Sequence, residues 1–276
     1  GTDVIVLGTN GVRYAVFDVE VVIAGGAGGT QSVILGTQGN TMTMSLVPSI
    51  IGNSGTDLIT LGSAGVTTKV SDLETLTGGV GTDAVTILTA GTTMQVSWLE
   101  TLTGGTGTDV ITIATAGSTM TVKLLETLGG GAGTDLVTFA SGGNTTLVSD
   151  IEMLTGGISV DVVILGTGGN TLQISRIETV TGDSGTDVVT VGATGVSVKV
   201  QGIETLIGGA GTDVVTFGTA GNTVLLSAVE SVIGATGTDV VTFGSAGSTA
   251  LISALETLVG GGGVDVVTVS ASGITL

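Results

Sequence analysis

Aspartate and glutamate are the residues of this sequence whose types and regular spacing could support chemistry. Nineteen of the 23 acidic residues fall into two series, and in both the residue number rises by 26 from one repeat to the next, as from Asp57 to Asp83. The aspartate series is Asp57, Asp83, Asp109, Asp135, Asp161, Asp187, Asp213, Asp239 and Asp265, with Asp3 ahead of it. The glutamate series is Glu20, Glu74, Glu100, Glu126, Glu152, Glu178, Glu204, Glu230 and Glu256. Gln31 and Pro48 each stand where a series skips one acid.

Equal spacing predicts that the carboxylates of each series stack, about 4.8 Å apart if the copies form adjacent parallel strands. Neighbouring charges would then repel by about 3–4 kcal/mol at an effective dielectric of 20. Four explanations can offset this: bound cations, raised pKa values, hydrogen bonds from loop N–H groups, or hydration and screening. For the aspartates we favour Ca²⁺, which takes six to eight oxygen ligands from carboxylates and carbonyls. The alternative is that each aspartate accepts N–H bonds in its own turn. For the glutamates, N–H bonding is favoured over metal ligation.

The elements that position these acids come from a sequence repeat with the same period, present in eleven copies. Positions are numbered here from the first glycine of "GGxGTD", so that the aspartate is position 6 and the glutamate position 23. Positions 8, 10, 19, 22 and 25 are apolar in every copy, and position 14 is glycine throughout. The register slips once, by two residues near 24–29.

Alternation at positions 7–10 and 15–19 predicts strands with one buried face, and a third short strand covers positions 22–26. Glycines at positions 1, 2, 4, 11 and 14 mark corners that need positive φ or a close backbone approach. We therefore predict an all-β parallel β-solenoid (β-helix) with 26-residue coils, three short strands per coil and about eleven coils. Right-handed coiling is the default for parallel crossovers. Residues 1–276 form one continuous array, expected to be a segment of a longer protein.

Composition excludes several classes of partner. The net charge is −18, and the five basic residues are Arg13, Lys69, Lys123, Arg176 and Lys199, so we expect no nucleic acid partner. Cysteine and histidine are both lacking, which removes disulfides, thiolate metal sites and the commonest general base. Apolar runs are too short for membrane insertion.

The strings "GGVGTDAVT" at 78–86, "GGTGTDVIT" at 104–112 and "GGAGTDVVT" at 208–216 fit the pattern GGxGxD-x-aliphatic-x. In this the chain resembles the RTX-type calcium-binding β-solenoid repeats of secreted bacterial proteins such as toxins, adhesins and S-layer proteins. The resemblance implies Ca²⁺ in glycine–aspartate turns and folding outside the cell. It covers only the nonapeptide of each repeat, so only one edge of each coil could carry such ions. Asn53, Asp183 and Ala235 depart from it at the second glycine.

A non-catalytic structural rod segment is the function that the sequence favours. It would belong to a secreted bacterial cell-surface protein, such as an S-layer subunit, an adhesin stalk or an extracellular filament. Near-uniform repeats favour this, and an outward apolar stripe at position 7 favours self-association with like rods; the stripe contains Val110, Leu136, Val188, Val214 and Val240. The alternative is an ice- or surface-binding domain that uses threonine ladders at positions 5, 9 and 16. A β-helical polysaccharide-active enzyme is disfavoured, because the acids recur evenly.

Residues 20–52 interrupt both acid series, through Gln31 and Pro48. We expect irregular coils there, with a bend or a contact site.

Overall fold

A computed structural model describes residues 1–25, 29–88, 91–114, 117–192 and 194–270. The chain divides into two compact units, Gly1–Thr138 (unit 1) and Phe139–Leu276 (unit 2). Both consist of short parallel strands, and the part of the chain that is described contains no helix.

The strands of unit 1 are three to five residues long. They are β1 (Val4–Val6), β2 (Arg13–Val16), β3 (Val21–Ile23), β4 (Ser32–Leu35), β5 (Thr41–Ser45), β6 (Ser49–Ile51), β7 (Leu58–Leu61), β8 (Thr67–Ser71), β9 (Thr75–Thr77), β10 (Ala84–Ile87), β11 (Thr93–Ser97), β12 (Thr101–Thr103), β13 (Val110–Ile113), β14 (Thr119–Lys123) and β15 (Thr127–Gly129). The boundary between the units falls within β16 (Leu136–Phe139).

The strands of unit 2 continue the same pattern. They are β17 (Thr145–Ser149), β18 (Met153–Thr155), β19 (Val162–Leu165), β20 (Thr171–Ser175), β21 (Thr179–Thr181), β22 (Val188–Val191), β23 (Ser197–Gln201), β24 (Thr205–Ile207), β25 (Val214–Phe217), β26 (Thr223–Ser227), β27 (Ser231–Ile233), β28 (Val240–Phe243), β29 (Thr249–Ser253), β30 (Thr257–Val259) and β31 (Val266–Val269).

The predicted fold class, a parallel β-solenoid, is confirmed, and each repeat does contain three strands. In the repeat that starts at Gly52, β7, β8 and β9 cover positions 7–10, 16–20 and 24–26. They lie within two residues of the ranges expected from apolar alternation. The side chains of positions 8, 10, 17, 19, 22 and 25 fill the interior, as Val215, Phe217, Val224, Leu226, Val229 and Val232 do. Complete burial of one such side chain stabilises the fold by about 1.5–3 kcal/mol.

The predicted coil is wrong, because one turn contains two strands and not three. In unit 1 the odd-numbered strands β1 to β15 pair in sequence to form one sheet, and the even-numbered strands β2 to β14 form the other. We call these the odd sheet and the even sheet, and use the same names in unit 2. One repeat of three strands therefore makes one and a half turns. The 31 described strands make about fifteen turns along the chain, where eleven were expected.

The strand pairing gives the length of each turn. Thr41 pairs with Leu58, Leu58 with Thr75, and Thr75 with Gln95. Three successive turns therefore lead from Thr41 to Gln95, whereas two repeats lead from Thr41 only to Thr93. Equivalent positions thus move by two residues along the strand every three turns.

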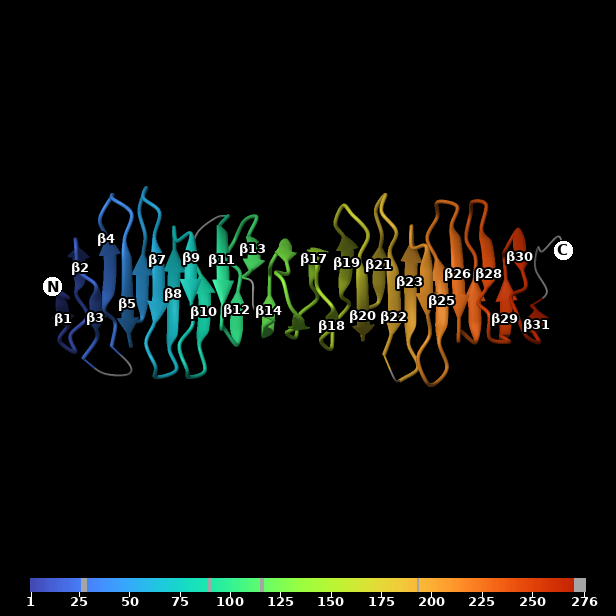
Figure 1. Ribbon diagram of the computed structural model, residues 1–276, viewed down its shortest axis with the longest axis horizontal. Coiled ribbons are helices and arrows are strands. Elements are labelled where there is room, and N and C mark those ends of the chain that lie inside the picture. Colours follow the sequence, from blue (N-terminus) through green and yellow to red (C-terminus); the bar gives the residue numbers. More distant parts are fainter. Residues whose placement is uncertain (26–28, 89–90, 115–116, 193, 271–276) are drawn as a thin grey trace. The chain divides into compact units, whose positions relative to one another are not determined.

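Corners join the two sheets along two edges. Figure 1 shows, within each unit, strands of the two sheets pointing in opposite directions and corners on both sides of them. A repeat has a long corner at positions 1–6, a second corner at positions 11–15 and a tight corner at positions 21–23. Since a repeat makes one and a half turns, each edge carries all three corners once every three turns.

Because successive repeats change sheets, equivalent outward residues of neighbouring repeats do not line up. The predicted stripe at position 7 is therefore wrong: Val214 in the odd sheet of unit 2 lies between Ser197 and Ser231. In the even sheet of that unit, Val188 lies between Thr171 and Thr205.

The tight corner contains a residue in the left-handed backbone conformation in every repeat whose tight corner is described. These position-21 residues have φ of 50–61°, and only Gly202 among them is a glycine; the others are Asp18, Leu46, Asp72, Trp98, Leu124, Asp150, Arg176, Ala228 and Ala254. Sequence reasoning placed positive φ or a close backbone approach at glycines: Gly211 and Gly91 have positive φ, whereas a Cβ at Gly221 would lie 2.6 Å from the carbonyl oxygen of Thr238. It missed position 21, because the residue types there vary.

Replacing the exposed Ala228, at φ 52°, with glycine is expected to stabilise the chain. Relief of about 1 kcal/mol of left-handed strain exceeds the roughly 0.5 kcal/mol of extra entropy that glycine gives the unfolded chain. We therefore expect the free energy of unfolding in urea to rise by about 0.5 kcal/mol. The matched control is the reverse change at the equivalent position, Gly202→Ala, which should lower it. Shifts of the same sign for both variants would contradict this explanation.

Candidate functional site

The position-6 aspartates lie inside the long corner, and their carboxylates bind backbone N–H groups. Of the nine predicted site residues, the eight from Asp57 to Asp239 are at most 1 % exposed, and Asp265 is partly exposed. The arrangement is the same at each of the nine. The Oδ1 atom accepts the N–H of position 15 in the preceding repeat, and Oδ2 accepts the N–H of position 2 in the same corner.

Asp213 shows the geometry of one such corner. Val196 N–H donates to Oδ1 and Gly209 N–H to Oδ2, both at 2.9 Å. The backbone N–H of Asp213 in turn donates to Oε2 of Glu230 at 2.8 Å. The Asp213 side chain thus links its corner to a corner in the preceding turn of the solenoid, and it also closes its own corner. Because the donors are backbone groups, Asn53, Asp183 and Ala235 donate just as glycine does. Space at position 2 is nevertheless narrow, since a Cβ at Gly209 would lie 2.1 Å from the carbonyl oxygen of Gly192.

Position 1 must be glycine for this corner to form. A Cβ atom at Gly208 would lie 1.6 Å from the carbonyl oxygen of Ala228 and 2.8 Å from Oδ2 of Asp213. Gly52, Gly78, Gly104, Gly156, Gly182 and Gly234 meet the position-21 carbonyl of the next turn in the same way, within 1.9 Å. The first glycine of the motif therefore gives both the left-handed corner and the carboxylate room to approach.

Asparagine at position 15 adds a third bond in four repeats. The side-chain Nδ2 of Asn40, Asn144, Asn170 and Asn222 donates to the same Oδ1, at 2.7–2.9 Å. These asparagines were not predicted as site residues. The signal that could have found them is their recurrence at position 15, directly after the glycine that every copy carries at position 14.

The position-23 glutamates have a related role nearer the surface. In eight repeats Oε2 accepts the N–H of the aspartate in the preceding turn, at 2.7–2.8 Å; the glutamates are Glu20, Glu74, Glu100, Glu126, Glu178, Glu204, Glu230 and Glu256. All eight side chains are exposed or partly exposed. Hydrogen bonding to the neighbouring corner was the favoured role for this series, and the geometry agrees with it.

The two-strand turn also removes the column of stacked aspartates that the sequence suggested. Consecutive aspartates lie on opposite edges, because Asp57 leads into β7 of the odd sheet and Asp83 into β10 of the even sheet. Aspartates on one edge are three turns apart, or about 14 Å. At that distance two charges repel by about 1 kcal/mol at a dielectric of 20, in place of about 3–4 kcal/mol. Cations are therefore not needed to hold an aspartate column together.

Calcium ligation by these aspartates would have to compete with their N–H bonds. Both carboxylate oxygens face N–H donors, whose partial positive charge repels a cation. Within the described ranges, no three acidic side chains lie close enough together to hold a metal ion. Ca²⁺ binding by this chain stays a prediction, tested below by chelation.

At residues 20–52, where both acid series are interrupted, the described strands keep their parallel pairing. The odd sheet continues through this segment, with Val21 paired to Thr43, a step two residues longer than that from Thr75 to Gln95. Gln31 is buried in the place of an aspartate and donates from Nε2 to the carbonyl oxygen of Gly8 at 2.5 Å. Its Oε1 has no hydrogen-bond partner in the part of the chain described here. Residues 26–28 of this corner lie outside the described ranges.

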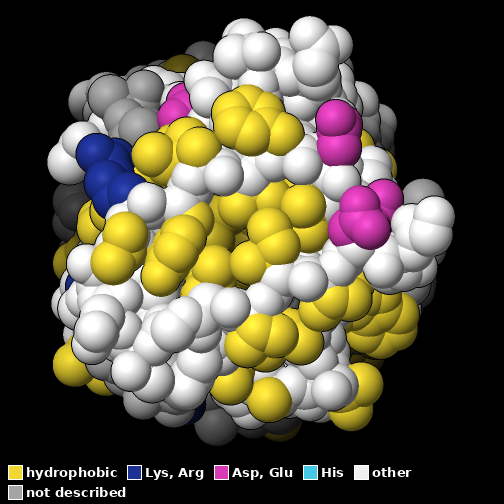
Figure 2. Space-filling model, turned by 90° about the vertical axis from the view of Figure 1, so that its left-hand side faces the viewer, with side chains coloured by type: hydrophobic (Ala, Val, Ile, Leu, Met, Phe, Trp, Pro, Cys, Tyr) yellow, Lys and Arg dark blue, Asp and Glu magenta, His cyan; other side chains and the backbone are white. Residues whose placement is uncertain are grey.

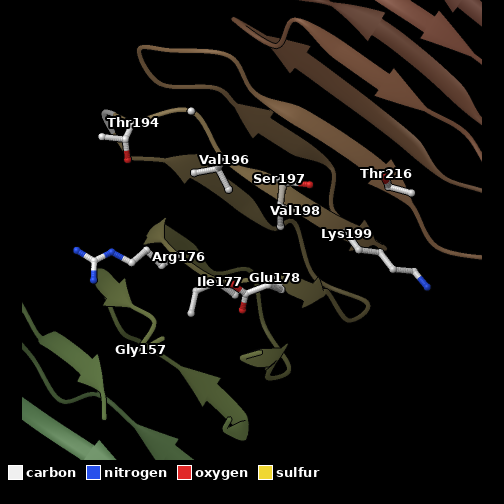
Figure 3. A pocket seen from close by; sticks show the side chains of 11 residues that line it. Gly157, Arg176, Ile177, Glu178, Thr194, Val196, Ser197, Val198, Lys199 and Thr216 are labelled. Atoms are coloured by element: carbon white, nitrogen blue, oxygen red, sulfur yellow. The ribbon is translucent and has the colours of Figure 1, made fainter. Parts of the chain in front are cut away.

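Grooves on the surface repeat as the corners do. Three of them have the same lining, a tight corner against positions 14–16 of the next repeat: they lie at Asp18–Glu20, Asp72–Glu74 and Trp98–Glu100. A larger groove in unit 2 has the same core, formed by Arg176, Glu178 and Ser197, and extends to Lys199 and Thr216. Figure 3 shows Arg176 and Lys199 pointing in opposite directions, away from Glu178. These two cations do not converge on one ligand.

No protein-family model, curated protein or solved structure matches this chain significantly. Among the residues that the structure describes, no helix is long and apolar enough to cross a membrane.

Proposed function

We propose that this chain is a non-catalytic structural repeat segment of a secreted bacterial cell-surface protein, such as an S-layer, an adhesin stalk or an extracellular filament. The observation that carries the proposal is the use of the acids. The carboxylate of each of the nine predicted aspartates accepts two backbone N–H groups, from position 15 of the preceding repeat and position 2 of its own corner. It is therefore not available as a general acid, base or nucleophile. Extracellular location rests on the resemblance of the GGxGTD strings to secreted repeat proteins.

Uniform corners support the proposal as well. Enzymes on repetitive folds need a few residues in one place that differ from the rest. Here the grooves at Asp72–Glu74 and Trp98–Glu100 are copies of one arrangement. Release of products from neutral or acidic polysaccharides by the purified chain, lost on mutation of the groove that contains Arg176, would contradict a purely structural role.

Ice binding, the alternative, would require an unbroken array of threonines. In the odd sheet of unit 1, the unbroken column Thr43–Thr60–Thr77 is only three threonines long and meets Val21 and Ser97 at its ends. The longer column Thr41–Leu58–Thr75–Gln95–Thr112 has another residue between successive threonines. The geometry therefore favours the structural role.

Removal of calcium is expected to leave the fold and its melting temperature unchanged, because N–H donors already satisfy the aspartate oxygens. The measurement is circular dichroism and calorimetry of the chain in excess EDTA and in millimolar Ca²⁺. Mg²⁺ at the same ionic strength is the control for screening of the net charge of −18. A transition that shifts upward with Ca²⁺ and not with Mg²⁺ would instead support the calcium prediction made from the motif.

A further inference from the structure

Three of the five basic residues form one straight column on the even sheet of unit 1. The register runs Arg13–Ser32–Ser49–Lys69–Thr86–Thr103–Lys123, each residue paired to the next. Arg13 and Lys69 are exposed, and Lys123 is partly exposed. We call this the cation column. Figure 2, which looks at the end of unit 1 that carries β1, shows dark blue side chains grouped on one side and most of the magenta carboxylates on the other.

The column is straight because its members occupy different positions of the repeat. Equivalent positions move by two residues every three turns, and the cations stand at positions 16, 18 and 20 in turn. The shift of two repeat positions from one cation to the next therefore cancels the shift of two residues along the strand, and the cations stay in line. Between two cations lie two hydroxyl residues, such as Ser32 and Ser49, and successive cations are about 14 Å apart.

The tight corners that lead into the odd sheet of unit 1 present acids at the same interval. Asp18 and Glu20 precede β3, and Asp72 and Glu74 precede β9, three turns later. All four side chains are exposed. Both lines follow from the three-turn period. Successive cations are about 14 Å apart and successive acidic corners about 16 Å apart, and long side chains can absorb this small difference.

The surface is hollowed at the middle of the cation column. A groove there is lined by Gln31, Pro48, Ser49, Thr67, Lys69 and Thr86. It lies at the interruption of the acid series, where Pro48 takes the place of a glutamate.

We propose that the cation column binds the acidic edge of a second copy of this chain, with Lys69 opposite Asp72 and Arg13 opposite Asp18. This rests on the proposal that the chain is a structural element. The net charge of −18 makes copies repel each other over most orientations, and the cation column holds every basic residue of unit 1, so it is the surface there that attracts an acidic edge. The outward side chains of the odd sheet of unit 1, from Val4 to Thr127, are uncharged and so do not attract an acidic edge electrostatically.

The test is sedimentation velocity of the full chain over a range of concentrations, in about 20 mM and about 0.5 M NaCl. We expect association at low salt and its loss at high salt. Lys69→Glu should weaken it by about fivefold or more, since an exposed ion pair becomes a repulsive one. Asp72→Lys should weaken it equally. A mixture of the two variants should associate as well as the unchanged chain, because the swapped charges attract again.

Lys199→Glu is the matched control, since it makes the same charge change outside the column, in unit 2. It should leave association within about twofold of the unchanged chain. Circular dichroism verifies that each variant is folded. Association that survives high salt and Lys69→Glu would place the interface on the uncharged odd sheet and overturn the proposal. A folded chain that stays monomeric would also overturn it, while leaving the structural role intact.

Discussion

Gly208→Ala is expected to lower the free energy of unfolding by about 3 kcal/mol or more. The added Cβ would lie 1.6 Å from the carbonyl oxygen of Ala228 and 2.8 Å from Oδ2 of Asp213. A flexible side chain could move away, but the first of these atoms belongs to backbone held in the left-handed conformation. The corner must therefore open, which also costs the N–H bonds to Asp213. Urea denaturation measures the loss, and amide hydrogen exchange at Gly209 and Val196 locates it.

Gly129→Ala is the matched control for this prediction. Its Cβ would meet nothing closer than the Thr112 hydroxyl at 3.9 Å, and the residue ends strand β15. We expect its effect to stay within about 0.5 kcal/mol, or to be slightly stabilising because alanine suits a strand better than glycine. Equal losses for both substitutions would show that general glycine content, and not this close approach, sets the stability of the corner.

Asp213→Asn is expected to cost about 1–3 kcal/mol although it changes no volume. The amide offers one oxygen where the carboxylate offers two, and its NH₂ group would face Val196 N–H or Gly209 N–H. One buried donor is then left without an acceptor. The loss should be the same in EDTA and in Ca²⁺, because the interaction that is removed involves no ion. Calorimetry in both buffers measures it.

Asp3→Asn is the comparison for the second prediction. Asp3 stands at the same position of the repeat, but its side chain is exposed to water. Water can replace the missing acceptor there, so we expect a change below about 0.5 kcal/mol. A loss at Asp213 that is found in Ca²⁺ and disappears in EDTA would point to a metal ligand and contradict the hydrogen-bonding explanation.

The fold was predictable because alternation reports which side chains are buried. It placed the strands of the repeat at Gly52 within two residues of β7, β8 and β9. It could not give the number of strands per turn, because burial does not say which strand is the neighbour. Thr41 pairs with Leu58, and not with Thr67 one full repeat later, because of the corner lengths. The predicted column of aspartates at about 4.8 Å failed for the same reason.

The role of the aspartates was left open by the sequence for a different reason. Their partners are backbone N–H groups, which every residue other than proline carries. Asn40, Val66 and Thr92 all donate to the aspartate of the following repeat, and their side chains share no property that a pattern could show. Only the asparagines, with their second donor, left a signal at that position.

Each repeat has three strands, and the strands alternate between two sheets. In the evolution of such an array it therefore matters whether copies of the repeat are gained or lost in odd or even numbers. Gain or loss of a single copy of the repeat would transfer every later strand of unit 1 to the opposite sheet. Buried corners would tolerate this, since both edges already carry all three corner types. Outward residues would not, because Lys69 would leave the line that it shares with Arg13. A change by two copies would keep Lys69 in the same sheet and shift it by only two residues along the strand. Selection on surface contacts would therefore favour changes by pairs of copies, whereas selection on stability alone would accept any number.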